Sequence, residues 1–198
     1  MDNYHSVNIE ENEPVKPEPR STKSILLEIV QTLLLAVVLY FVIDAFMGRV
    51  RVENISMKPT LNPGEFLLVN KLAYKLGDVD HGDIVIFHYP LNPAEDYIKR
   101  VIGTPGDVVE ITNGNVSVNG YTLTEDYISA PPSYSGTWTV PADSIFVLGD
   151  NRNQSSDSHT WGMVPMDNVL GRALVVYWPF SEAKILKNPE IVNAASTP

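Results

Sequence analysis

Residues 97–107 read Tyr-Ile-Lys-Arg-Val-Ile-Gly-Thr-Pro-Gly-Asp, and this stretch predicts the kind of fold. Successive side chains of a β-strand point to opposite faces, so Lys99 lies on one face between Tyr97 and Val101. Arg100 points to the other face. The Gly-Thr-Pro-Gly sequence that follows cannot continue a regular strand and predicts a turn. The pattern is therefore that of a β-strand with one cation on each face.

Other parts of the chain repeat this β pattern. Asn113-Gly114 and Asn119-Gly120 are dipeptides typical of hairpin turns. Between them, Val116 and Val118 alternate with polar residues, as on a half-exposed ribbon. Five short runs are rich in β-branched and aromatic residues: 66–69, 83–87, 108–111, 144–148 and 173–178. Residues 71–76 predict one short helical turn in an otherwise mostly β fold.

The N-terminal part differs, because residues 25–47 are mostly apolar. As a helix these 23 residues span roughly 34 Å, enough to cross a bilayer core. The only acids, Glu28 and Asp44, lie about one turn inside the ends, where they could reach the interface. A buried core helix is the alternative. Ala45-Phe46-Met47 lacks the small-x-small pattern of a cleaved signal peptide.

This segment divides the chain into three predicted parts. Residues 1–24 are polar and contain three prolines among charges, which predicts a disordered tail. Residues 25–47 are the predicted transmembrane helix. Residues 48–198 are long enough for one domain with its own core. Basic residues flank the apolar segment on both sides, so charge does not fix its orientation.

Composition excludes several classes of function. The net charge is −10, and residues 48–198 carry eleven Lys or Arg against seventeen Asp or Glu. A nucleic-acid partner needs a basic excess that is absent here. The chain has no cysteine, so it has no disulfide, thiol nucleophile or thiolate metal site.

Metal and nucleotide chemistry have little support in the sequence. The histidines are His5, His81, His88 and His159, and no pair has the spacing of two ligands on one helix face. Phosphate-binding glycine motifs do not occur between a strand and a helix. A Ser-His-Asp triad is conceivable near residues 155–159, but no G-x-S-x-G accompanies it. We therefore predict no metal and no cofactor.

Three segments carry candidate chemistry. Residues 56–61, Ser-Met-Lys-Pro-Thr-Leu, follow the apolar segment closely, so a nucleophile there would lie near the membrane surface; a simple turn is the alternative. Lys99, between large side chains, would lose charge on burial and could act as a general base, unless it is a surface lysine. Residues 149–165 form a dense polar segment that could cap its own backbone, or else a solvated loop.

Four blocks, in order, resemble the type I signal peptidases, the bacterial leader peptidases of the serine–lysine class. They are S-M-x-P-T-L at 56–61, G-D-I-V-x-F at 82–87, K-R-V-I-G-x-P-G-D at 99–107 and G-D-N-R-x-x-S-x-D-S-x-x-W-G-x-V-P at 149–165. The resemblance implies a single membrane helix followed by an antiparallel β catalytic domain. A small β-ribbon subdomain would occupy about 108–140.

The resemblance also implies roles for particular residues. Ser56 corresponds to the nucleophile, Lys99 to the general base and Ser155 to the hydroxyl that orients the lysine amine. Asp150 and Asp157 match structural polar positions beside the site. The substrate pockets, which accept small residues at −1 and −3, match Val52, Met57, Leu61, Tyr97 and Ile98.

The implied setting is a bacterial cell membrane, with a cytoplasmic N-terminus and an extracytoplasmic catalytic domain. The implied partners are the signal peptides of exported preproteins and the lipid bilayer.

Two positions depart from the family pattern. His159 replaces the usual arginine partner of Asp157, and a histidine pairs more weakly with a carboxylate at neutral pH. Asn54 lies two residues before the nucleophile, where some members have a hydroxyl that donates to the oxyanion. The backbone N–H of Ser56 is then the firm oxyanion donor, with the Asn54 amide as a second candidate.

Two alternatives stay open at this point. One is another serine–lysine peptidase on the same scaffold, such as a self-cleaving repressor-type protein. The apolar helix and the lack of a DNA-binding module argue against it. The other is a non-enzymatic membrane-anchored β domain that binds exported chains.

Overall fold

The computed structural model describes residues 21–189, and the chain divides into two compact units, Met1–Phe41 and Val42–Pro198. Helix α1 spans Thr22–Phe46, so it begins slightly before the predicted apolar segment. Residues 1–20 of the predicted disordered tail lie outside the described residues. Within α1, Ile25–Phe46 is long and apolar enough to cross a membrane. Its large apolar side chains are exposed, which favours a membrane helix over a buried core helix.

The larger sheet of the second unit has eight strands, and every pairing in it is antiparallel. Its order is β1-β2-β11-β3-β4-β9-β10, with β12 pairing with β11. The strands are β1 Met47–Arg51, β2 Phe66–Asn70, β3 Ile84–Tyr89, β4 Asn92–Gly103, β9 Ser144–Leu148, β10 Val164–Pro165, β11 Val169–Trp178 and β12 Lys184–Ile185. The predicted strand that carries Lys99 and Arg100 is the second half of β4, with neighbours on both sides.

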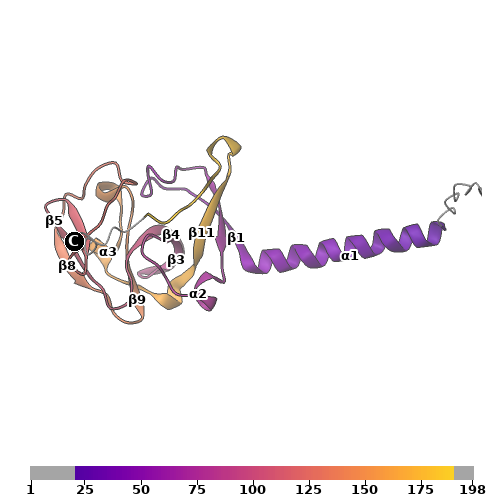
Figure 1. Ribbon diagram of the computed structural model, residues 1–198, viewed down its shortest axis with the longest axis horizontal. Helices are drawn as coiled ribbons and strands as arrows, with labels where there is room; N and C mark the ends of the chain where they lie inside the picture. Colours follow the sequence, from indigo (N-terminus) through magenta and orange to yellow (C-terminus); the bar gives the residue numbers. More distant parts are fainter. Residues whose placement is uncertain (1–20, 190–198) are drawn as a thin grey trace, which may run out of the picture. The chain divides into compact units, whose positions relative to one another are not determined.

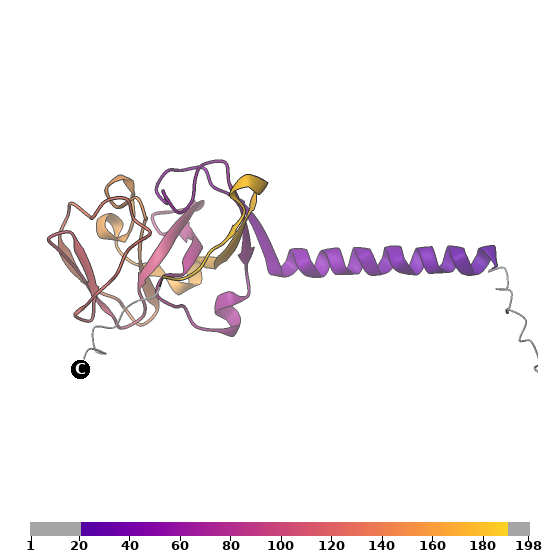
Figure 2. The same ribbon diagram turned by 45° about the horizontal axis from the view of Figure 1, so that its top comes forward.

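A smaller antiparallel sheet has the order β7-β6-β5-β8. Its strands are β5 Val108–Thr112, β6 Asn115–Val118, β7 Tyr121–Thr122 and β8 Gly136–Thr139. Asn113 and Gly114 have φ of 51° and 80°, and Asn119 and Gly120 have 53° and 84°. Two consecutive positive φ values are those of a type I′ hairpin turn, which confirms the predicted turns. Figures 1 and 2 show this sheet at the end of the β unit away from β1 and β11.

The helices of the β unit are short. Helix α2, Ala73–Leu76, lies within the predicted helical turn, and α3, Ser158–Trp161, follows Asp157, whose side chain accepts from the N–H of His159. The described part of this unit also contains three 3-10 turns: η1 Arg152–Gln154, η2 Met166–Asn168 and η3 Phe180–Glu182.

Strand β4 joins the two sheets. Its first residues are exposed, and its last five, from Lys99 to Gly103, are buried. A Cβ at Gly103 would lie 2.6 Å from Val109 Cγ2 on β5, so this glycine permits the close approach of the small sheet. Ile102 belongs to the core cluster that contains the inner face of the small sheet, whereas Val101 packs with β3 and β9 residues. The base predicted at Lys99 therefore lies where the packed part of β4 begins.

The mostly antiparallel β class is confirmed. The sequence analysis missed β1, β8, β10, β12 and the first half of β4. Two of these strands, β10 and β12, are only two residues long and pair at sheet edges, so they leave no alternation to recognise. In the first half of β4 the side chains are exposed on both faces, which removes the same signal.

Candidate active site

The fold brings together Ser56 and Lys99, which are 43 residues apart in sequence. The amine Nζ of Lys99 lies 2.7 Å from the hydroxyl Oγ of Ser56, a hydrogen-bonding distance. Ser56 lies in the turn segment between β1 and β2, whereas Lys99 is on β4. A nucleophile and its base in direct contact are what covalent catalysis requires.

Burial controls the charge of Lys99. The side chain is 4% exposed, and its amine also donates to the carbonyl oxygen of Ile98 at 3.2 Å. Both of its hydrogen-bonding oxygens are neutral. Burial lowers the pKa of Lys99 to about 8, against the opposing effect of the carboxylates of Asp157 and Asp150. An appreciable fraction of this amine is then neutral near physiological pH.

The turn that carries Ser56 is held by the polar segment 149–165. The backbone N–H of Asn151 donates to Ser56 O at 3.0 Å, and its side chain donates to Ile55 O at 3.2 Å. At Gly149 a Cβ would lie 2.5 Å from Ser56 O and would also collide with Ser155 Oγ. Only glycine allows these two serine-bearing segments to approach so closely.

Ser155, the predicted lysine-orienting residue, lies in this packed region. Its Oγ is buried and has no hydrogen-bond partner within residues 21–189. The hydroxyl lies beside Gly149, whose other neighbour is the backbone of Ser56. An unpaired buried hydroxyl is costly, and it is free to bond to a group that moves or arrives.

A cleft of about 420 Å³ opens beside the Ser56–Lys99 pair. It is lined by residues 50–57, residues 96–99, Gln154 and Ser156. Four of the five predicted pocket positions are on its wall: Val52, Met57, Tyr97 and Ile98. Leu61 is instead fully buried in the core with Val52 and Met57. Asn54 is exposed and lines the cleft.

A family model described as signal peptidase, peptidase S26, matches residues 26–178. This chain belongs to that family. It is 44% identical over 186 residues to a signal peptidase I of Leptolyngbya laminosa, covering 89% of this chain and 91% of the relative. It is 36% identical over 188 residues to signal peptidase IB of Staphylococcus aureus strain MRSA252, covering 85% and 97%.

A crystal structure of a signal peptidase I from Enterococcus faecalis is also similar to this chain. The sequence identity is 32%, and the match covers 48% of this chain and 97% of that one, with a TM-score of 0.45.

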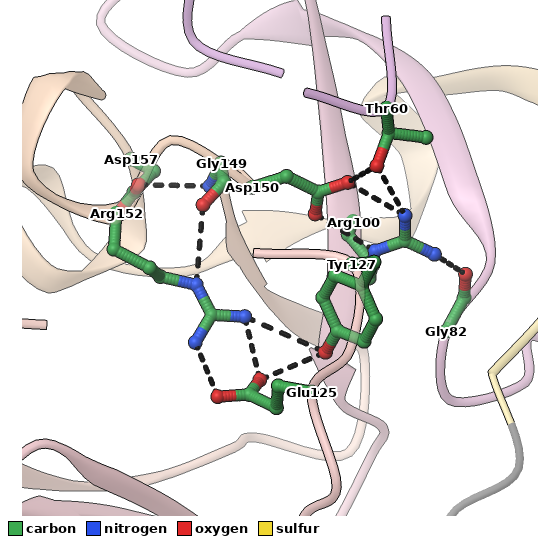
Figure 3. A network of polar contacts seen from close by, with 9 residues as sticks. All are labelled: Thr60, Gly82, Arg100, Glu125, Tyr127, Gly149, Asp150, Arg152 and Asp157. Carbon is green, nitrogen blue, oxygen red and sulfur yellow. Dashed lines mark hydrogen bonds and ion pairs between the residues drawn. The ribbon is translucent and has the colours of Figure 1, made fainter. Parts of the chain in front are cut away.

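The opposite face of β4 in this signal peptidase family member carries a buried ion pair. Arg100 is 2% exposed and donates to both carboxylate oxygens of Asp150, at 2.8 and 2.6 Å. Arg100 also donates to Gly82 O at 2.9 Å, and the hydroxyl of Thr60 donates to Asp150. Figure 3 shows these groups converging from β4, the turn segment after Ser56, the loop after β9 and the loop before β3. The pair ties together the segments that carry Lys99 and Ser56.

Asp157 and His159 form a second polar contact of the peptidase. Asp157 is fully buried and accepts from the backbone N–H of Gly149 at 2.9 Å. The Nδ1 of His159 contacts the same carboxylate, and the His159 ring stacks on Tyr134 with centroids 3.7 Å apart. The histidine therefore does occupy the place of a partner for Asp157.

Sequence reasoning missed some of the polar residues around the site. Thr60, Glu125 and Arg152 all contact the buried network, and none was assigned a role. One signal was available at Arg100, because an arginine between two isoleucines on a strand face needs an anionic partner. As for a metal, residues 21–189 contain no cluster of three or more His, Asp or Glu that could hold one.

Proposed function

We propose that this chain is a membrane-bound serine endopeptidase that cleaves signal peptides from exported preproteins after small residues, with Ser56 and Lys99 as its catalytic dyad. The observation that carries the proposal is the 2.7 Å contact between Ser56 Oγ and the buried amine of Lys99. Membership of the signal peptidase family supports the substrate class.

The first step is acylation. Neutral Lys99 takes the proton from Ser56 Oγ, and the oxygen attacks the carbonyl carbon of the scissile bond. The backbone N–H of Ser56 donates to the oxyanion, with the exposed amide of Asn54 as a second candidate donor. The protonated Lys99 then gives its proton to the leaving amine, and the peptide bond breaks.

The second step is hydrolysis of the ester. Lys99, neutral again, takes a proton from a water molecule, which attacks the acyl carbon. The ester bond to Ser56 then breaks, and Lys99 returns the proton to Ser56 Oγ. Ser155 would hold the amine along the direction of proton transfer. Its buried, unpaired hydroxyl is available for such a bond once substrate enters the cleft.

The cleft fits an extended peptide. Its walls are two stretches of backbone, residues 50–57 and 96–99, so a substrate strand can lie between them with main-chain hydrogen bonds. Val52, Met57, Tyr97 and Ile98 restrict the space for side chains at −1 and −3. Backbone pairing would then supply affinity without reading sequence, while the pockets select small residues.

Helix α1 would anchor the enzyme as a single span, with a cytoplasmic N-terminus and an extracytoplasmic catalytic domain. A signal peptide is itself inserted in the bilayer. Confining enzyme and substrate to one membrane raises their effective concentration without any new contact.

The test is a preprotein cleavage assay in detergent that compares the native chain with Ser56→Ala. We expect product from the native chain and none from the variant. Cleavage by Ser56→Ala at the native rate would overturn the proposal. Binding of signal peptide without product from the native chain would favour the non-enzymatic alternative, and scission of the protein itself without preprotein would favour the repressor-type peptidase.

A further inference from the structure

The loop between β7 and β8, the two edge strands of the small sheet, contacts the buried ion pair of Arg100 and Asp150. Its carboxylate, Glu125, accepts from Arg152 Nη1 at 2.7 Å and from Nη2 at 2.6 Å. The side chain of Arg152 is 0% exposed and that of Glu125 is 8% exposed. Figure 3 shows this fork-to-fork pair next to the Arg100–Asp150 pair. Two buried ion pairs thus lie side by side, one formed by a residue from the small sheet's loop.

Tyr127 joins the two pairs. Its ring centroid lies 4.1 Å from the guanidinium carbon of Arg100 and 5.8 Å from that of Arg152. Its hydroxyl donates to Glu125 Oε1 at 2.8 Å. A ring between two cations is attracted to both by its quadrupole. The segment from Glu125 to Tyr127 therefore contacts Arg100 on β4 and Arg152 in the polar segment 149–165.

Arg152 links Glu125 to the backbone of Gly149, which packs against Ser56. Its Nε donates to the carbonyl oxygen of Gly149 at 3.2 Å. Gly149 is the residue against which both Ser56 O and Ser155 Oγ pack. The neighbouring Asn151 donates to Ser56 O. The orientation of the Arg152 side chain thus helps to set where the Gly149 backbone stands against the nucleophile turn.

We propose that Glu125 is a positioning residue for the Ser56–Lys99 dyad, acting through Arg152 and the Gly149 backbone. The proposal rests on the peptidase function proposed above. Glu125 accepts two hydrogen bonds that orient the Arg152 guanidinium. Arg152 in turn donates to the Gly149 carbonyl oxygen and holds it in place. The small sheet then has a role in catalysis, because its loop holds the polar segment 149–165 in place against Ser56.

The geometry separates positioning from substrate binding. Glu125, Tyr127 and Arg152 are not among the residues that line the cleft. Removing the Glu125 carboxylate would leave the cleft walls in place and disturb the distance between the reacting groups. Small misplacements of reacting groups cost about a hundredfold in rate. A lower kcat with an unchanged KM is the expected signature.

The experiment measures kcat and KM of the full-length chain in detergent with a preprotein substrate. We expect Glu125→Gln to lower kcat about tenfold or more while KM stays within about twofold. The matched control is Asp126→Asn, which makes the same charge change on an exposed neighbour in the same loop and should retain native kcat. Native kcat in Glu125→Gln, or a raised KM alone, would overturn the proposal.

A second variant covers the case in which Glu125→Gln does not fold, because an unpaired buried arginine is destabilising. Glu125→Leu with Arg152→Met replaces both charges by apolar groups, which commonly preserves a fold. We expect this chain to fold, as judged by near-UV circular dichroism, and to have the reduced kcat. A folded double variant with native kcat would refute positioning.

A double-mutant cycle distinguishes positioning from general damage. Ser155→Ala and Glu125→Gln should lower kcat by less together than the product of their separate factors, because both act on the packing around Gly149. Fully multiplicative effects would show that Glu125 acts elsewhere. The native and Ser56→Ala chains in the same assay test the peptidase function itself, so the two proposals fail separately.

Discussion

Lys99 and Arg100 are adjacent residues of β4 with buried basic side chains, but their hydrogen-bond partners differ in charge. Arg100 has a bidentate carboxylate partner, Asp150, and its charge is satisfied. Lys99 contacts a hydroxyl and a backbone carbonyl, and burial lowers its pKa to about 8. The same strand thus holds one cation paired with a carboxylate and one whose burial favours loss of its proton.

The difference lies in the partners and not in the burial. Both side chains are at least 96% buried, at 4% and 2% exposure. A paired guanidinium is a structural tie between segments, whereas an amine without a close anion is prepared for proton transfer. Because successive side chains alternate, the buried ion pair lies on one face of β4 and the proposed base lies on the other.

The comparison predicts the largest effect for Lys99→Arg. This change keeps a positive charge and a long side chain but removes the ability to lose a proton near neutral pH. We expect preprotein cleavage to fall about a thousandfold, in the range attributed to a general base. Single-turnover cleavage assays measure it. Activity within about tenfold of native in this variant would mean that Lys99 does not act as the base.

On the other face, Asp150→Asn should reduce stability. It leaves the Arg100 guanidinium buried without its anion, which costs about 3–5 kcal/mol in free energy of unfolding. Urea unfolding followed by tryptophan fluorescence gives the value, with Glu110→Gln on an exposed strand position as the control. A loss as small as that of the control would show that the pair is not needed for folding.

The pH dependence of kcat/KM tests the same difference between Lys99 and Arg100. In the proposed mechanism the neutral form of Lys99 is the active one, so kcat/KM should rise about tenfold per pH unit below the pKa of Lys99 and level off above about 8. Initial rates from pH 6 to 10 in one detergent test this. A profile that stays flat over this range would argue against a lysine base.

The smallest effect should come from a third cation close in sequence. Lys58 is two residues after Ser56 but is exposed, on the turn that carries the nucleophile. We expect Lys58→Ala to keep cleavage within about twofold, because surface charges contribute little. If Lys58→Ala instead abolished cleavage, the assignment of Lys99 as the sole base would need revision.

Sequence alternation was enough to place Lys99 and Arg100 on opposite faces of the strand. The Asn-Gly dipeptides were enough for the two hairpins, because few other residues tolerate two positive φ values in succession. In these cases the determining physics is local, within a few residues of the motif.

Partners distant in sequence could not be read in this way. Glu125 and Arg152 are 27 residues apart, and no pattern in the sequence around either residue indicates the other as its partner. Leu61 was expected in a substrate pocket, but it is fully buried in the core and is not among the residues that line the cleft. Alternation gives the face on which a side chain lies, whereas its neighbour depends on the whole tertiary packing.

The place of β4 inside the larger sheet also has a consequence for motion. Lys99 lies on a strand hydrogen-bonded to β3 on one side and β9 on the other, whereas Ser56 lies in a turn outside any strand. Amide hydrogen exchange at Lys99 should then require opening of the sheet, while the turn at Ser56 exchanges through local fluctuations. The proposed dyad would then join a residue of a slow-exchanging strand to a residue of a faster-exchanging turn.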